Sequence, residues 1–134
     1  MATLLNILLV AAGGGLGGMA RFWVSGVVGR RYGETFPWGT LVVNVSGAAS
    51  IGVLGALVLD PGPQPAGQET LWAGLAIGVL GSYTTVSSFS LQTLALMRSG
   101  EPLRAALNVL ASVLLCLSAA ATGYLAVGLA ATAM

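Results

Sequence analysis

The sequence contains no histidine and only one cysteine, Cys116. Without histidine, the chain lacks the commonest general base and the commonest metal ligand of proteins. A single cysteine cannot form a disulfide within the chain. These absences argue against an enzyme.

Charged side chains are also scarce, at 7% of the 134 residues, and the formal net charge is +1. Soluble domains carry about 25% charged residues, so this chain would lack the polar coat that it needs in water. The small net charge excludes a broad basic face for nucleic acid. Because 56% of the residues are hydrophobic, the composition predicts an integral membrane protein.

Four apolar segments fill most of the sequence, with short polar stretches between them. Each is near or above the roughly 20 residues that a helix needs to span a bilayer, and the alternating pattern of an outer-membrane barrel is absent. We therefore expect an all-α, multi-pass membrane protein whose residues 1–134 form one four-helix transmembrane domain. The expected spans are residues 4–28, 38–59, 70–97 and 103–129. No basic residue precedes the first span, which predicts a retained helix rather than a cleaved signal.

The arginines outside the spans are unevenly placed. Arg30 and Arg31 lie in the first loop, whereas Arg98 and Arg104 flank the third. The positive-inside rule then places the first and third loops in the cytoplasm and both termini outside.

The third segment carries a run of hydroxyl side chains from Ser82 to Ser90, beside Gly81. At about 28 residues it is longer than a straight span requires, and its serines and threonines compete with helical hydrogen bonds. We expect a break near its middle, with Gly81 supplying backbone freedom. Such a break frees carbonyls for a cation and N–H groups for an anion. The alternative is an unbroken helix whose hydroxyls bond to the preceding turn.

Polar residues in the other spans allow two interpretations. Asn44, inside the second span, either bonds across helices or lines a pore as a donor. Asn108, Ser112 and Cys116 share one face of the fourth span, which can border an aqueous path or pack against another helix. Arg21 lies late in the first span, where it is either functional or extends to the interface.

Glycines at positions 13–15, 17 and 18 precede Arg21 and predict a face for close helix packing. Carboxylates, by contrast, are absent from the span interiors, because Glu34, Asp60, Glu69 and Glu101 lie in loops or at segment ends. A proton-coupled cation exporter would need an intramembrane carboxylate. The interior instead offers an arginine, amides and hydroxyls, which are donors suited to an anion.

Three motifs together resemble the small fluoride channels of the Fluc/CrcB family; they are residues 14–21, 38–47 and 78–90. The resemblance implies an antiparallel, dual-topology dimer in the bacterial inner membrane, with two pores and passive, highly selective fluoride export. It implies a structural sodium ion at the dimer axis, held by the backbone carbonyls of Gly81 and Thr84. It also implies that Asn44 and hydroxyls near the break, Thr85 and Ser88, line the pore, and that Arg21 faces a vestibule. Phe89 matches the second of two family phenylalanines whose ring edges face the path, and we include Ser112 among the pore residues.

The chain departs from the family pattern in three respects. Val86 replaces the first phenylalanine, Gln92 stands where a glutamate is frequent, and the arginines favour one orientation. These departures suggest one half of a heterodimer with a homologous subunit, the alternative being a homodimer that tolerates Val86. Two other functions compete with the fluoride channel, namely a small four-helix drug or cation exporter and a non-conducting assembly subunit.

Overall fold

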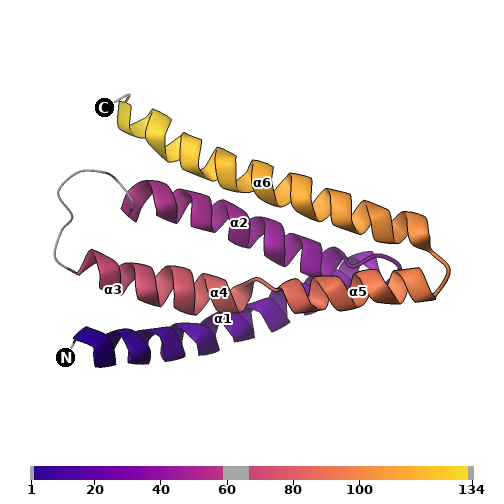
Figure 1. Cartoon of the computed structure of the whole chain (residues 1–134), viewed down its shortest axis with the longest axis horizontal. Helices are drawn as coiled ribbons and strands as arrows, with labels where there is room; N and C mark the ends of the chain where they lie inside the picture. Colours follow the sequence, from indigo (N-terminus) through magenta and orange to yellow (C-terminus); the bar gives the residue numbers. More distant parts are fainter. Residues whose placement is uncertain (1, 59–66, 133–134) are drawn as a thin grey trace.

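The computed structural model describes residues 2–58 and 67–132 of the chain (Figure 1). Within these residues, four helical rods are each long and apolar enough to cross a membrane. The third rod is made of several short helices and is interrupted near its middle. The helices are α1 (Ala2–Tyr32), α2 (Trp38–Val58), the third rod with α3 (Gln68–Trp72), the π-helix η1 (Ala73–Leu80), α4 (Gly81–Tyr83) and α5 (Val86–Arg98), and finally α6 (Pro102–Thr132).

The expected all-α fold with a broken third span is thus confirmed. The first and last helices run a few residues beyond the expected spans. Residue 59, the expected end of the second span, and Asp60 lie outside the described residues.

Glycines stop two of the helices and let the chain reverse in short loops. Gly33 follows α1 with φ 81°, and its N–H donates to the Gly29 carbonyl at 2.9 Å. Gly100 follows α5 with φ 80°, and the next N–H, of Glu101, donates to the Leu96 carbonyl at 2.9 Å. A left-handed glycine of this kind ends a helix without steric cost.

Both ends of the described chain lie at one end of the bundle, and the loops after α1 and α5 lie at the other (Figure 1). Arg30, Arg31, Arg98 and Arg104 therefore share the end opposite the termini. Which end faces the cytoplasm stays a prediction.

The helices pack in two close pairs, α2 against α6 and α1 against η1. Glycine makes both pairs possible. A Cβ on Gly17 would lie 2.1 Å from the Val79 carbonyl oxygen, and one on Gly52 would lie 2.1 Å from that of Ala120. Backbones this close leave no room for a side chain, so the predicted glycine packing face of the first span is in contact with η1.

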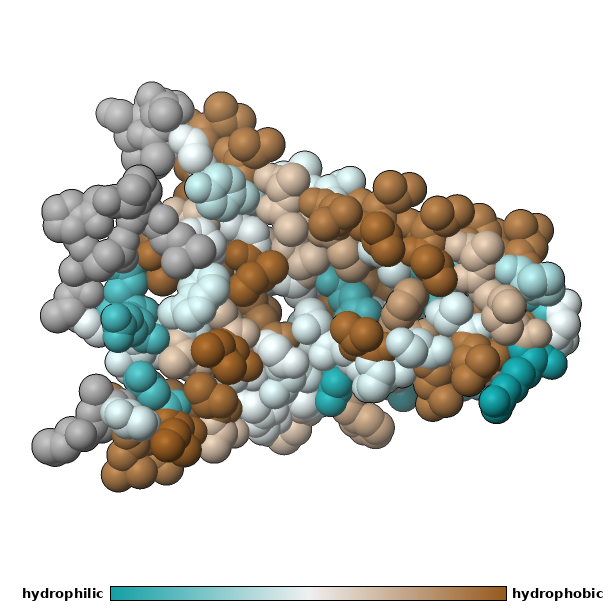
Figure 2. Space-filling model, in the orientation of Figure 1, coloured by the Kyte–Doolittle hydropathy of each residue, from teal (hydrophilic) through white to brown (hydrophobic). Residues whose placement is uncertain are grey.

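Large apolar side chains cover much of the outer surface, as the brown areas of Figure 2 show. Leucines and valines of α1 and α6 are prominent among the exposed residues. In water such a surface would drive association, whereas lipid tails accept it. The fold therefore presents a hydrophobic exterior around a small interior that holds the break.

Candidate functional site

The break in the third rod consists of two extended residues. Thr84 has φ −77° and ψ 160°, and Thr85 has φ −152° and ψ 120°. Gly81 remains helical, with φ −63° and ψ −30°. The expectation that Gly81 supplies the backbone freedom is therefore wrong. Extended conformations with negative φ are open to any residue, so the break needs no glycine but does need partners for the backbone groups that it frees.

Asn44 of α2 supplies those partners. Its Nδ2 donates to the Thr85 carbonyl at 3.0 Å, and its Oδ1 accepts from the Thr85 N–H at 2.8 Å. In an unbroken helix, the Thr85 N–H would donate to the Gly81 carbonyl. The Asn44 amide thus replaces the hydrogen bonds that Thr85 loses at the break. The Gly81 carbonyl, in turn, no longer accepts from the Thr85 N–H.

Two further residues of α2 hold the same segment. Ser46 Oγ lies 2.8 Å from the Tyr83 hydroxyl. Gly47 provides space for Thr84, because a Cβ on Gly47 would lie 2.3 Å from the Thr84 methyl carbon Cγ2. Three consecutive residues before and at the break therefore each contact α2, and we call these α2 residues (Asn44, Ser46 and Gly47) the cradle.

Hydroxyl groups gather where α5 starts. Thr85 is the N-cap, and its Oγ1 accepts from the Ser88 N–H at 3.2 Å. The same oxygen lies 3.1 Å from Ser87 Oγ and 3.2 Å from Ser88 Oγ. A threonine oxygen in this position satisfies one of the free N–H groups at the start of a helix.

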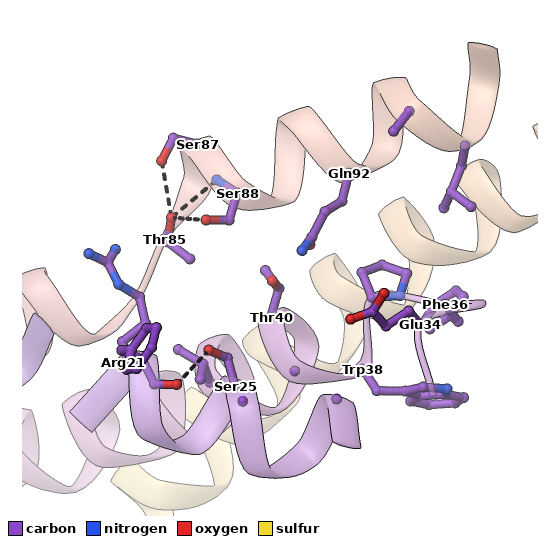
Figure 3. Close-up of a pocket in the computed structure, with 18 of the residues that line it drawn as sticks. Arg21, Ser25, Glu34, Phe36, Trp38, Thr40, Thr85, Ser87, Ser88 and Gln92 are labelled. Carbon is purple, nitrogen blue, oxygen red and sulfur yellow. Dashed lines mark hydrogen bonds between the residues drawn. The ribbon is translucent and has the colours of Figure 1, made fainter. Parts of the chain in front are cut away.

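A hollow of about 870 Å³ opens on one side of the break (Figure 3). Arg21, Thr85 and Ser88 line it near the break. Arg21 is half-buried, and its Nη1 donates to the Thr84 carbonyl at 3.4 Å. The guanidinium therefore lies at the break instead of extending to the end of α1.

The other end of this first hollow is formed by the loop after α1. Glu34, Phe36 and Trp38 line it there, with the two rings 4.7 Å apart between centroids. Gln92 extends from α5 toward Thr40 in Figure 3. Within the described part of the chain, the Gln92 Oε1 is buried without a hydrogen-bond partner. A buried amide of this kind calls for a ligand or an ordered water.

A second hollow of about 580 Å³ lies further along α2, where residues of the stretch 44–51 line it together with residues on both sides of the break. Four of the predicted pore residues line it, namely Asn44, Thr85, Phe89 and Ser112. Gly81 and Thr84, predicted to bind sodium, also line it, as does Val86. Thr85 borders both hollows, so the predicted residues are distributed around this one threonine.

Several contacts were not anticipated from the sequence. The cradle roles of Ser46 and Gly47 were missed, although both residues lie in the quoted motif of the second span, close to Asn44. Thr93 of α5 was also missed as the partner of Asn108, whose Nδ2 lies 2.8 Å from Thr93 Oγ1. Asn108 and Ser112 are both buried, so that face of α6 packs inward.

Comparison with known proteins gives matches over almost the whole chain. Residues 8–124 match the model of the family described as CrcB-like protein, Camphor Resistance (CrcB). A protein of Rhodopseudomonas palustris (strain BisB18), named Fluoride-specific ion channel FluC 2, is 55% identical over 128 residues, covering 90% of this chain and 92% of its own. A protein of the same name from Bradyrhizobium diazoefficiens is 52% identical over 120 residues, covering 90% and 87%. The Fluoride-specific ion channel FluC of Opitutus terrae is 51% identical over 119 residues, covering 89% of each chain.

Proposed function

The chain belongs to the CrcB family, and from that premise we propose that it is a subunit of a passive, fluoride-selective ion channel. Relatives at 51–55% identity carry the name of such a channel. The observation that carries the proposal is the interrupted third rod, whose extended backbone and hydroxyl groups lie between two hollows. The channel would export fluoride across the bacterial inner membrane and so relieve fluoride toxicity.

The chemistry around the break suits a small anion. Fluoride is strongly hydrated, so a pore must replace its water with close hydrogen-bond donors. Arg21 and Ser88 offer donors in the first hollow. The Thr85 hydroxyl, between the two hollows, donates to Ser88 Oγ at 3.2 Å and so leaves the Ser88 proton free for the ion. The Asn44 amide has two protons, of which one goes to the Thr85 carbonyl, so the other can face the ion.

Beyond Thr85, the route would follow the second hollow past Phe89 and Ser112. The edge of a benzene ring carries partial positive charge. A ring edge can therefore attract fluoride without the full charge that would trap it.

We further propose that two subunits assemble in antiparallel orientation. One chain contributes a single phenylalanine to the second hollow, and α5 buries none of its own residues. A partner would cover this surface and complete the path. Residues of the described chain form no cluster of histidine, cysteine, aspartate or glutamate that could hold a metal, so a structural cation at the axis would need backbone oxygens.

We propose the carbonyls of Gly81 and Thr84 as sodium ligands; in the single chain the Thr84 carbonyl accepts from Arg21 Nη1 at 3.4 Å, so the guanidinium would give up this bond when sodium binds. The Gly81 carbonyl has lost its helical donor to Asn44, and Thr84 is extended. Unwound carbonyls of this kind coordinate sodium in membrane proteins. One chain supplies too few oxygens, so a second subunit would provide the rest. The ion would add positive potential near the path and hold the two breaks together.

The exposure of Val86 favours a heterodimer. This residue is 77% exposed at the start of α5, beside the second hollow. It would present a methyl surface, rather than a ring edge, to that hollow. A homologous partner with a phenylalanine at this position would restore one complete pore, and the four arginines at one end would be offset by a partner of opposite orientation.

Efflux from vesicles tests the function. The purified chain, alone or with a co-expressed homologue, is reconstituted into liposomes, and fluoride and chloride release are compared with electrodes. We expect fluoride release that greatly exceeds chloride release when the correct partner is present. Robust efflux from the chain alone would establish a homodimer. Trapped fluoride in both preparations would remove the proposal in favour of an assembly subunit, and release that depends on a proton gradient would favour an exporter.

A further inference from the structure

A chain of polar contacts connects α6 to Phe89. Asn108 of α6 is only 2% exposed. Its Nδ2 donates to Thr93 Oγ1 on α5 at 2.8 Å, and that hydroxyl donates to the Phe89 carbonyl at 2.7 Å. Because the hydroxyl proton goes to Phe89, the Thr93 oxygen is free to accept from Asn108, and bonds arranged in such a series strengthen one another.

Helix α5 needs a contact of this kind. The break separates it from α4, so the preceding helix does not fix its rotation about its own axis. It buries none of its residues within the chain. Asn44 holds its start through Thr85, and the Gly100 turn holds its end. The hydrogen bond from Asn108 to Thr93 holds α5 between its start and its end.

We propose that Asn108 is a positioning residue, which acts through Thr93 to set the rotation of α5 and thereby the direction of the Phe89 ring in the second hollow. The inference rests on the proposed function, in which Phe89 borders the fluoride path. A helix turns about 100° per residue, so a small change of rotation moves the ring edge away from the path. Thr93 and Phe89 lie four residues apart on one face of α5, so restraint at one is transmitted to the other.

A simpler role for Asn108 is to join two helices without influencing the ring. The two roles differ in what a mutation changes. If the Asn108 bond only holds α5 and α6 together, its loss lowers stability and leaves the Phe89 environment and the ion selectivity unchanged. Loss of a positioning bond alters both.

The test uses the reconstituted channel with its partner, labelled with 4-fluorophenylalanine and observed by ¹⁹F NMR; Phe89→Leu identifies the Phe89 signal among the three phenylalanines. Thr93→Val removes the acceptor at constant shape, and Asn108→Leu removes the donor. Thr122→Val is the matched control, because Thr122 Oγ1 bonds the Ser118 carbonyl at 2.8 Å within its own exposed stretch of α6. Thr93→Ser keeps the hydroxyl and should behave as the parent.

We expect Thr93→Val and Asn108→Leu to shift the Phe89 signal and to lower the fluoride-to-chloride flux ratio at least fivefold, with no change for Thr122→Val or Thr93→Ser. An unmoved signal in Thr93→Val would overturn the proposal, whatever happens to stability. If Asn108→Leu does not fold, Thr93→Val alone decides. A parent chain that carries no fluoride would end the proposed function, yet the shift of the signal would still report the coupling.

Discussion

The side-chain amide of Asn44 pairs with both backbone groups of Thr85, at 3.0 Å to the carbonyl and 2.8 Å from the N–H. A neighbouring β-strand would satisfy an extended residue in the same way. In lipid, an unpaired backbone group is costly, so this one side chain makes an extended residue tolerable at membrane depth.

Replacement of Asn44 should therefore damage the break. Asn44→Ala leaves the Thr85 N–H and carbonyl without partners, at about 1–3 kcal/mol for each buried group. We expect at least a tenfold loss of fluoride flux in liposomes, with the dimer intact by cross-linking. Ser50→Ala, which removes an exposed hydroxyl bonded within α2, is the control. Loss of the dimer in Asn44→Ala would mean that this amide joins subunits instead.

The close contact between Gly47 and Thr84 predicts that a substitution at one residue can be compensated by a substitution at the other. The added Cβ of Gly47→Ala would lie 2.3 Å from the Thr84 Cγ2, so it should displace the break and reduce flux severalfold. Thr84→Ser removes that methyl group and keeps the hydroxyl that donates to the Leu80 carbonyl. The double variant Gly47→Ala/Thr84→Ser should therefore conduct better than Gly47→Ala alone. Equal flux in the two would show that the clash is not the cause.

Arg21 should attract anions into the first hollow. In Arg21→Gln we expect fluoride flux to fall more at about 10 mM salt than at about 300 mM, because salt screens exposed charge over roughly 10 Å at 0.1 M. Arg31→Gln, a charge change at the exposed end of α1, is the control for overall charge. A loss that does not vary with salt would mean that Arg21 acts by holding the Thr84 carbonyl.

Close packing of α1 on η1 predicts a loss of stability. A Cβ on Gly17 would meet the Val79 carbonyl oxygen at 2.1 Å, whereas one on Gly15 would meet nothing within 4 Å. Overpacking of this kind costs about 1–3 kcal/mol. Thermal unfolding in detergent should therefore show a lower midpoint for Gly17→Ala and little change for Gly15→Ala. Similar midpoints would show that α1 moves away from η1 without penalty.

Helix number, the existence of the break and the glycine packing face could all be predicted from the sequence, because hydropathy, segment length and small-residue spacing are local signals. Which residues of the hydroxyl run become extended could not be predicted. Gly81 is the more flexible residue, yet Thr84 and Thr85 are the extended ones. Their conformation depends on Asn44 and Gly47, about 40 positions earlier, and no local pattern reports a contact at that distance.

The same limit applies to side-chain roles. Asn44 was open to two interpretations, a bond across helices or a pore donor. Its two bonds to Thr85 are of the first kind, and its place in the lining of the second hollow leaves the second open. Asn108 lay on a recognised polar face, but its partner Thr93 is on a helix whose rotation only the folded chain fixes.

The dependence of the break on the cradle also limits how this chain can be re-engineered. A third span moved into an unrelated four-helix protein would form an unbroken helix unless the neighbouring host helix carried the equivalents of Asn44 and Gly47. These are a side-chain amide and, three residues later, a glycine. Conversely, hybrids between relatives should remain active only when the second and third spans come from the same parent, so the two spans form a single unit of exchange.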